Sequence, residues 1–284
     1  MLANVFHKLL LLVAYQHISN GAEWNYKQHG KDWTDLCSSG KMQSPLSLNT
    51  KNARVVNIPK IVFGNYNQQL KGPIHIYNNG HSLYMSISYT VNGKKPFITG
   101  GLMKNAYDAI GLHFHWGAPR EAGSEHALNR KQYAGEMHIV HRNNKYNSTE
   151  DAVTKSNGIA VLGVFLGMTK KHTDKSAAIA RIIKAALKVT VDRANTTIPA
   201  GFSLGQLIGS INHNDFLTYH GSLTTPLCQE AVTWTVFTQV MPVPFPSLLP
   251  LYGIRDHENH KLLRNYRQVQ NLNGRTVYHR KGPR

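Results

Sequence analysis

Three histidines in two short segments are the residues of this sequence whose types and spacing best fit a chemical role. His113 and His115 lie in residues 111–117, and His138 lies in residues 135–142. Side chains of a strand alternate between its faces, so His113 and His115 share one face if their segment is extended. Two such strands side by side would bring three imidazoles to one point. Three neutral histidines with a fourth position open form the ligand set of a catalytic zinc ion, whereas structural zinc sites are closed.

The structural alternative for these histidines has to be weighed, because the chain contains 16 of them. A lone His-x-His pair is more often structural than metal-binding. A third histidine on a strand-like segment favours a metal, and so does Glu136, which shares a face with His138. We therefore predict a metal site.

The elements that must position these residues are mainly β-strands. Residues 85–91 alternate apolar with polar side chains, which predicts a half-buried strand. Residues 159–166 form a continuous apolar run, typical of a central strand covered on both faces. Residues 232–236 alternate again. One amphipathic helix is predicted over residues 176–189.

Turn signals and length complete the prediction of the fold. Asn-Gly pairs at residues 79–80, 92–93 and 273–274 mark turns, and the proline-rich residues 241–250 are expected to form a loop or a sheet edge. No repeat or linker divides the 284 residues, a length that large β-rich domains reach as one unit. The sequence predicts a single domain of mainly β (α+β) class, with a large sheet and short surface helices.

The first residues of the chain have the features of a secretory signal. Lys8 precedes an apolar run at residues 9–14, and small residues follow up to Ala22. We expect a signal peptide over residues 1–22 and a catalytic domain over residues 23–284, with a short buried helix as the less favoured alternative. No later segment has the roughly 18 uninterrupted apolar residues of a membrane span.

Two cysteines and two sequons agree with export. Cys37 and Cys228 allow one pairing, and in a secreted chain a disulfide is the expected state, with two buried free thiols as the alternative. Asn147 and Asn195 each begin an Asn-x-Ser/Thr sequon and are candidate glycosylation sites. We predict a secreted, extracellular glycoprotein.

The charge of the chain is strongly positive, with a formal net value of +17. Such a charge favours anionic surroundings. No basic helix or aromatic ladder typical of nucleic-acid binding is present, so nucleic acid is not an expected partner. Because the basic residues are dispersed, the prediction is weak attraction to acidic polysaccharide or matrix.

A set of short motifs, taken in chain order, carries a resemblance to a known family. The motifs are Gln43-Ser-Pro45, Asn78-Asn-Gly-His81, His113-Phe-His-Trp-Gly117, Gly123-Ser-Glu-His126, Glu136-Met-His138, Ala160-Val-Leu-Gly163, Gly221-Ser-Leu-Thr-Thr-Pro226, Val232-Thr-Trp234 and Asn265-Tyr-Arg267. From Trp24 to about Tyr278 the chain resembles the α-class carbonic anhydrases. The resemblance implies a central twisted, mostly antiparallel sheet of about ten strands, with zinc at the floor of a conical cleft. It also implies the disulfide between the two cysteines, as in extracellular members.

The resemblance implies an activity and its catalytic residues. The expected reaction is zinc-dependent reversible hydration of carbon dioxide to bicarbonate and a proton, by attack of a zinc-bound hydroxide. The three histidines would hold Zn²⁺. Thr224 would accept a hydrogen bond from the hydroxide and donate to Glu125, and His81 would shuttle the proton. In isolation these three residues would be an ordinary turn threonine, a surface acid and a hairpin histidine.

Other residues receive roles from the same resemblance. Glu136 would accept a hydrogen bond from His138, the carbonyl of Asn265 would orient His115, and Tyr26 would order water. His126 and His141 match buried structural histidines. The residues expected to contact substrate are Thr225 for bicarbonate and, for carbon dioxide, the apolar wall Val140, Val161, Leu223, Val232 and Trp234.

The chain departs from the family pattern at three positions. Gly111 stands where the usual glutamine partner of His113 would be, so another group must substitute or zinc binding weakens roughly tenfold. Tyr84 stands where cleft-lining polar residues are common, and Arg142 replaces a frequent aromatic residue. These departures put rate and inhibitor profile in doubt rather than reaction class.

Two competing functions remain open to test. One is a catalytically silent relative that serves in adhesion or in a matrix, but such relatives typically lose a zinc histidine, and this chain has all three as well as Thr224 and Glu125. The other is an active enzyme held by its positive charge on an acidic matrix, whose retention would fall as salt rises.

Overall fold

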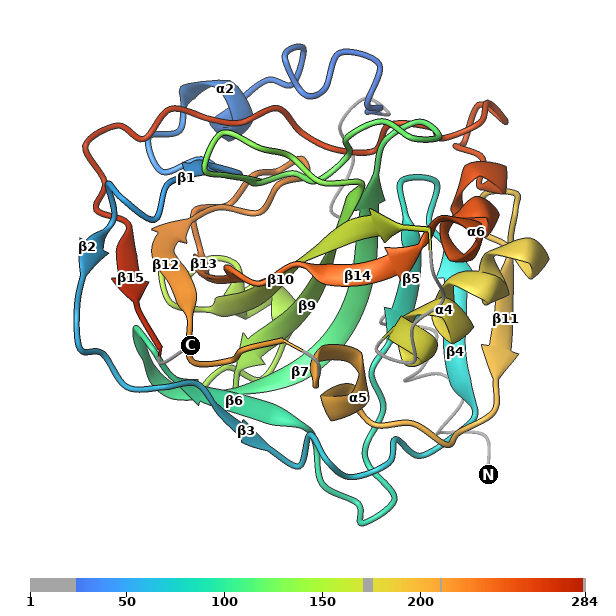
Figure 1. The fold of residues 1–284 in the computed structure, drawn as a ribbon, viewed down its shortest axis with the longest axis horizontal. Helices are drawn as coiled ribbons and strands as arrows, with labels where there is room; N and C mark the ends of the chain where they lie inside the picture. The colour runs from blue at the N-terminus through green and yellow to red at the C-terminus, as the bar shows by residue number, and fades with distance from the viewer. Residues whose placement is uncertain (1–23, 171–175, 210, 283–284) are drawn as a thin grey trace.

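The protein is described by a computed structural model that covers residues 24–170, 176–209 and 211–282. The predicted signal peptide, residues 1–22, lies outside the described residues. Within the described part a single large mixed sheet of 13 strands dominates, with short helices around it (Figure 1). The predicted mainly β class and single domain are confirmed.

The sheet has a main path of ten strands, to which three more strands attach. In spatial order the path runs through β11 (Asn195–Ile198), β4 (Ile74–Asn78), β5 (Leu83–Ser86), β7 (Met103–Trp116), β9 (Gly135–Asn143), β10 (Ile159–Thr169), β13 (Val232–Phe237), β12 (Phe216–Gly221), β15 (Tyr278–Arg280) and β2 (Arg54–Val55). Off this path, β14 (Met241–Pro244) pairs with β10, and β6 (Phe97–Gly100) pairs with β7 and with β3 (Val62–Gly64). A second sheet joins β1 (Ser47–Leu48) to β8 (Ala127–Leu128).

Most strand pairs are antiparallel, and β10 is the main exception because it runs parallel to β13 and β14. The apolar run at residues 159–166 is buried along its whole length, as predicted for a central strand. The proline-rich residues 241–250 form the edge strand β14, followed by α6 (Phe245–Leu248) and the 3-10 helix η3 (Leu249–Gly253). An edge accepts proline because the missing N–H has no ladder partner to lose.

The predicted strand over residues 85–91 is only half right. β5 ends at Ser86, and Tyr89 and Val91 are 53% and 60% exposed. β7 pairs with β5 at residues 111–113 but with β6 at residues 103–108, and its register shifts in between. Because β6 occupies that edge of β7, the chain after β5 leaves the sheet and turns at Asn92-Gly93, where Gly93 has a φ of +77°.

The helices are short. The predicted helix over residues 176–189 is α4 (Ala177–Lys184) continued by the 3-10 helix η2 (Ala185–Lys188). It lies beside α6 at the end of the sheet that contains β4 and β11 (Figure 1). The other α-helices of the described residues are α2 (Leu36–Ser39), α3 (Thr149–Ala152) and α5 (Leu204–Ile208).

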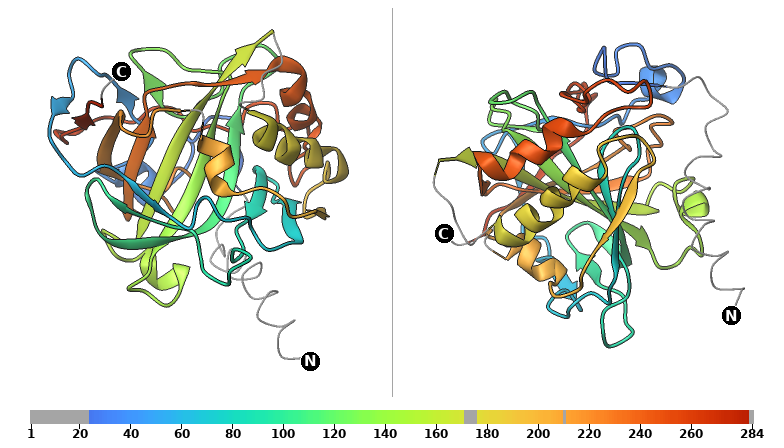
Figure 2. Two further views of the ribbon diagram at one scale, coloured as in Figure 1. Left: turned by 60° about the horizontal axis from the view of Figure 1, so that its bottom comes forward. Right: turned by 90° about the vertical axis from the view of Figure 1, so that its right-hand side faces the viewer.

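The sheet separates two hydrophobic cores. Figure 2 shows α4, α5 and η3 on one face of the sheet. The helix-side core lies on this face and includes Met137 and Ile139 of β9. The site-side core lies on the other face and includes Val161 and Trp234, with Val140 of β9 packed against it. Since successive residues of β9 point to opposite faces, His138 lies on the site side together with Val140.

Candidate metal centre

The three histidines meet at the centre of the sheet. His113 on β7 lies directly opposite His138 on β9, and His115 lies opposite Glu136. The ring centroids of the three histidines are 4.6 to 5.2 Å apart. One nitrogen from each ring lies within 4.8 Å of the other two. The two-strand arrangement expected from the sequence is the one that the structure contains.

Hydrogen bonds fix the orientation of the His115 and His138 rings. His115 Nδ1 donates to the carbonyl oxygen of Asn265 at 2.7 Å, and His138 Nε2 lies 2.8 Å from Glu136 Oε1. Each bond leaves the opposite ring nitrogen, His115 Nε2 or His138 Nδ1, as the lone-pair donor. His113 Nε2 approaches His138 Nδ1 at 3.3 Å. Both of the oxygen partners expected from the sequence lie in contact with their histidines.

The arrangement fits a divalent cation. His115 Nε2 is buried and has no hydrogen-bond partner, and the same is true of Glu125 Oε2, which lies 3.4 Å from it. Buried polar atoms are almost always paired, so an unpaired lone pair aimed at two other imidazoles calls for an electron-pair acceptor. Three imidazole nitrogens suit zinc, and with only three protein donors one coordination position stays open.

Burial keeps the three histidines neutral. It lowers the pKa of His113 well below the usual histidine value, and it lowers that of His115 to about 3 and that of His138 as well. Neighbouring imidazoles push the pKa values of His113 and His115 in the same direction. At neutral pH the ring lone pairs are therefore available, and no proton has to be displaced when a metal binds.

Glu136 joins two histidines below the metal centre. Its Oε1 lies 2.7 Å from His126 Nδ1 and 2.8 Å from His138 Nε2. Burial alone would raise the pKa of Glu136, but electrostatic interactions and hydrogen bonds with the His126 and His138 rings hold it well below its usual value. The other ring nitrogen of His126 lies 2.7 Å from the hydroxyl of Tyr219. Both nitrogens of His126 are thus engaged, as expected for a structural histidine rather than a ligand.

Glu125 and Thr224 come together above the histidines. Both side chains are buried, and Glu125 Oε1 accepts a hydrogen bond from the backbone N–H of Arg267 at 2.8 Å. Burial raises the pKa of Glu125 well above its usual value, while a hydrogen bond from the Thr224 side chain and the Arg267 N–H oppose that rise. Oε2 has no hydrogen-bond partner and faces the histidines, 3.4 Å from His115 Nε2 and 3.9 Å from His138 Nδ1.

The five apolar residues expected at the site all belong to, or pack against, the site-side core. Val140, Val161 and Trp234 form a continuous row, because Val161 pairs with Val140 across β9 and with Trp234 across β13. The Trp234 ring lies 4.8 Å from that of His138. Val232 is buried, whereas Leu223 and Thr225 are partly exposed on the segment after β12. The expected conical cleft stays a prediction.

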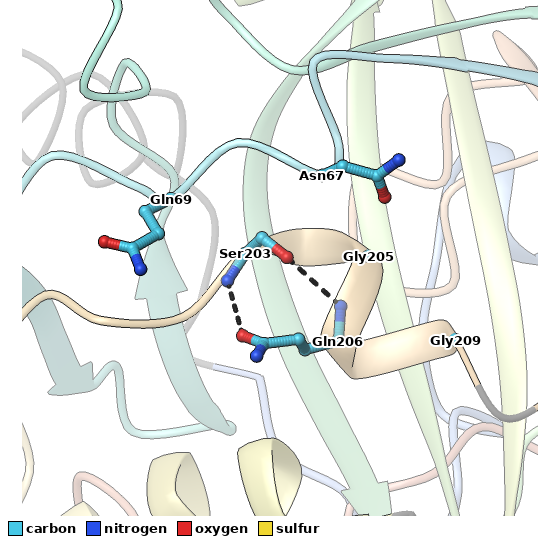
Figure 3. A pocket seen from close by; sticks show the side chains of 6 residues that line it. All are labelled: Asn67, Gln69, Ser203, Gly205, Gln206 and Gly209. Atoms are coloured by element: carbon cyan, nitrogen blue, oxygen red, sulfur yellow. Dashed lines mark hydrogen bonds between the residues drawn. The ribbon is translucent and has the colours of Figure 1, made fainter.

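A groove of about 420 Å³ lies elsewhere, beside α5 (Figure 3). Gly205 of this groove donates its N–H to the carbonyl of Tyr66, and the Tyr66 hydroxyl lies 2.5 Å from His141 Nε2. His141 alternates with His138 along β9 and points into the helix-side core. The groove is therefore on the sheet face opposite the metal centre and has no part in it. Its lining residues are Asn67, Gln69, Ser203, Gly205, Gln206 and Gly209.

His81 follows the turn at Asn79-Gly80. The backbone N–H of His81 donates a hydrogen bond to the Asn79 side chain at 3.1 Å. Its ring stacks on Trp24 with centroids 3.6 Å apart and planes 10° apart. The rings of His257 and Tyr26 lie 5.8 and 6.4 Å away. Burial, with help from His257, lowers the pKa of His81 to about 3. In this position the imidazole is neutral and does not accept a proton at neutral pH.

The sequence assigned no role to Arg267. Its guanidinium links the site to residues 37–44. It donates to the carbonyls of Ser44 and Cys37 and to the side chain of Gln43, each within 2.8 Å, while its backbone N–H binds Glu125. Its place in the Asn265-Tyr-Arg267 motif was the available signal. The stacking partner of His81, Trp24, was missed because the contact joins distant parts of the chain.

A pH dependence of stability follows from His141. This ring is fully buried, which lowers its pKa from 6.5 to about 3. The unfolded chain therefore binds the proton more readily, and the folded state loses stability as the pH falls from 6.5 towards 3. With one pKa unit worth about 1.4 kcal/mol, we expect the stability advantage of the wild type over His141→Gln to shrink by roughly 3 kcal/mol between pH 7 and pH 4.

Urea unfolding of both proteins with a chelator present, so that metal release does not contribute, measures this difference. His75→Gln, at an exposed position of β4, is the matched control and should show no such change. A gap between wild type and His141→Gln that stays constant with pH would contradict the prediction.

The disulfide joins the segment before the site to the loop that follows Thr224. Cys37 and Cys228 are bonded, with their Cα atoms 5.0 Å apart, so the predicted pairing is present. Cys228 N donates to the carbonyl of Thr225, and the carbonyl of Cys37 accepts from Arg267. The bond therefore anchors both ends of the network around Glu125.

Comparisons with known proteins point the same way as the geometry. The sequence model of the eukaryotic-type carbonic anhydrase family matches residues 22–281. The chain is 31% identical to carbonic anhydrase 15 of Mus musculus over 95% of this chain and 86% of the relative. It is 32% identical to carbonic anhydrase 3 of Bos taurus over 90% of this chain and 97% of the relative. The same identity and the same coverage of both chains hold for carbonic anhydrase 1 of Mus musculus.

Proposed function

The chain belongs to the eukaryotic-type, α-class carbonic anhydrases, enzymes of carbon dioxide hydration, and we propose that it works with a zinc ion held by His113, His115 and His138. The observation that carries the metal assignment is the buried, unpaired Nε2 of His115, aimed at the two other rings. When bound, zinc supplies acidity: in carbonic anhydrases, themselves the standard example of the effect, it lowers the pKa of a coordinated water to about 7.

Thr224 and Glu125 select what can occupy the open position. If the Thr224 hydroxyl donates its proton to the Glu125 carboxylate, its oxygen is left to face the site as an acceptor only. A ligand that can donate a proton is then preferred over one that cannot. A nearby cation favours the ionised carboxyl that this relay needs and offsets the effect of burial on Glu125.

The apolar row beside the histidines suits carbon dioxide, which has little capacity for hydrogen bonding. Val140, Val161 and Trp234 present side chains without a free donor towards the site, because Trp234 Nε1 already donates to the carbonyl of Ser222 at 3.0 Å. Leu223 and Val232 complete this wall, and Thr225 is the proposed contact of bicarbonate. Weak hydration of such a wall lets the gas displace water readily.

His81 is the proposed proton shuttle, with Tyr26 helping to order the water chain. Stacked on Trp24 it has a pKa of about 3, so the shuttle must leave the stack and regain water before it can take a proton at neutral pH. An imidazole with an ordinary pKa can both accept and release a proton near pH 7.

Replacing His81 by alanine should slow turnover on the order of 100-fold in weak buffer, the scale of a general acid–base group. Added imidazole should restore part of the rate, because it can carry the proton in place of the lost side chain. Stopped-flow carbon dioxide hydration at several imidazole concentrations measures both effects. His75→Ala should behave as the wild type, and a His81→Ala rate that does not depend on buffer would remove His81 from this role.

The proposed setting is extracellular, with a signal peptide at residues 1–22 and a catalytic domain over residues 23–284. The disulfide favours an oxidising compartment. Asn147 and Asn195 are both exposed, as glycosylation requires. In the part of the chain that the structure describes, no helix has the length and apolar character needed to cross a membrane. Weak attraction of the basic chain to acidic polysaccharide or matrix belongs to the same proposal.

The experiment that tests this function is elemental analysis of the purified protein together with a carbon dioxide hydration assay. About one zinc per chain and rapid hydration are expected. A metal-replete protein without hydration activity would instead support the catalytically silent alternative, a relative that serves in adhesion or in a matrix.

A further inference from the structure

The hydroxyl end of Tyr84 lies against Gly111. On β5 and β7, Tyr84 pairs with His113 and Ser86 pairs with Gly111. A Cβ atom placed on Gly111 would lie 1.7 Å from the Tyr84 hydroxyl oxygen and 2.3 Å from the ring carbon that carries it. The phenol therefore occupies the volume that any side chain at position 111 would need.

The Tyr84 ring is held in a row of three rings that runs across the sheet. Tyr77 on β4, Tyr84 on β5 and His113 on β7 are successive cross-strand partners. The centroids of Tyr77 and Tyr84 are 4.9 Å apart, and those of Tyr84 and His113 are 6.2 Å apart with planes only 9° apart. Tyr84 thus runs parallel to the histidine ring, and its hydroxyl reaches the position two residues upstream on the same face.

The other strand of the metal centre shows what that upstream position does. Glu136 stands two residues before His138 on the same face of β9, and its carboxylate fixes the orientation of that imidazole. Gly111 stands in the same relation to His113 on β7 but has no side chain to offer. The group that fills this place comes from the neighbouring strand, and it carries a hydroxyl that can both donate and accept.

We propose that Tyr84 is a positioning residue that orients His113 towards the metal, in the place that a side chain at position 111 would otherwise take. The proposal rests on the zinc function proposed above. It adds the identity of the group that orients His113, the third of the proposed ligands. Gly111 and Tyr84 then form one unit, since the glycine makes room for the phenol and the phenol replaces the missing side chain.

The direct test is Tyr84→Phe, which keeps the ring row and removes the hydroxyl. Zinc affinity, measured by competition with a chromogenic chelator, should fall roughly tenfold, the scale found when a partner of a metal ligand is lost. The visible absorption spectrum of the Co²⁺-substituted protein should shift, because the geometry at His113 changes. Tyr77→Phe, one strand further away, is the matched control and should leave affinity and spectrum unchanged.

Exchange of the two residues tests the pairing. Gly111→Gln alone should destabilise the protein and weaken zinc binding, because its Cβ meets the phenol. Tyr84→Ala combined with Gly111→Gln frees the space, and its zinc affinity should recover beyond that of either single variant. A purely structural role of Tyr84 would leave the Co²⁺ spectrum of Tyr84→Phe as in the wild type.

A Tyr84→Phe protein with wild-type zinc affinity and Co²⁺ spectrum, or a double variant no better than the single ones, would overturn the proposal. Failure of the zinc function itself looks different, since the wild-type protein would then bind no zinc.

Discussion

Replacing His115 by alanine is expected to remove zinc binding and carbon dioxide hydration together. This histidine supplies the buried unpaired nitrogen at the centre of the site. Structural zinc sites of zinc fingers bind the ion with roughly 10–16 kcal/mol shared among four ligands, so one ligand contributes about 2.5–4 kcal/mol. That amounts to a loss of roughly 10²–10³-fold in affinity, and the remaining metal would lack the ligand geometry that catalysis needs.

The measurement is zinc content after dialysis, followed by stopped-flow hydration of carbon dioxide. His115→Gln separates the ligand from the fold, because its amide can still donate to the carbonyl of Asn265 but does not match imidazole as a zinc ligand. His220→Ala, an exposed histidine of β12, should keep metal and activity. Full zinc content and full activity in His115→Ala would rule out the metal assignment.

Removal of the disulfide is expected to have the largest effect on stability. Cys37 and Cys228 are separated by 191 residues. In the chain-entropy account a bond across so long a loop contributes about 5 kcal/mol by restricting the unfolded chain. The double variant Cys37→Ser with Cys228→Ser should therefore lose up to about 5 kcal/mol of unfolding free energy, much of the total for a typical domain.

Urea denaturation of the variant and of the oxidised wild type measures this loss. The reduced wild type is the natural control and should unfold with the variant rather than with the oxidised protein. The hydrogen bonds from Cys228 N to Thr225 and from Arg267 to Cys37 add a local prediction: activity should fall before global unfolding begins. An unfolding free energy within about 1 kcal/mol of the oxidised wild type would contradict the expectation.

Several parts of the fold and of the site were predictable because they depend on local periodicity. The alternation of faces places His113 and His115 together, and the unbroken apolar run at residues 159–166 identifies β10 as a central strand. The strand prediction at residues 85–91 was wrong at Tyr89 and Val91. Alternation of apolar and polar residues does not indicate which other strand will pair with a given segment. There β6 takes the edge of β7, and the segment after β5 is left outside.

The sequence by itself determined the class of the fold and pointed to the three histidines proposed as the donor set. Ligand type, strand period and cysteine count are properties of the residues themselves and survive any arrangement of the chain. The tertiary structure alone decided that Tyr84 lies over Gly111, that Arg267 holds Glu125, and that Trp24 stacks on His81, whose burial lowers its pKa. Each of these contacts joins residues that are distant along the chain or lie on different strands, and its energy depends on burial that exists only once the sheet has assembled.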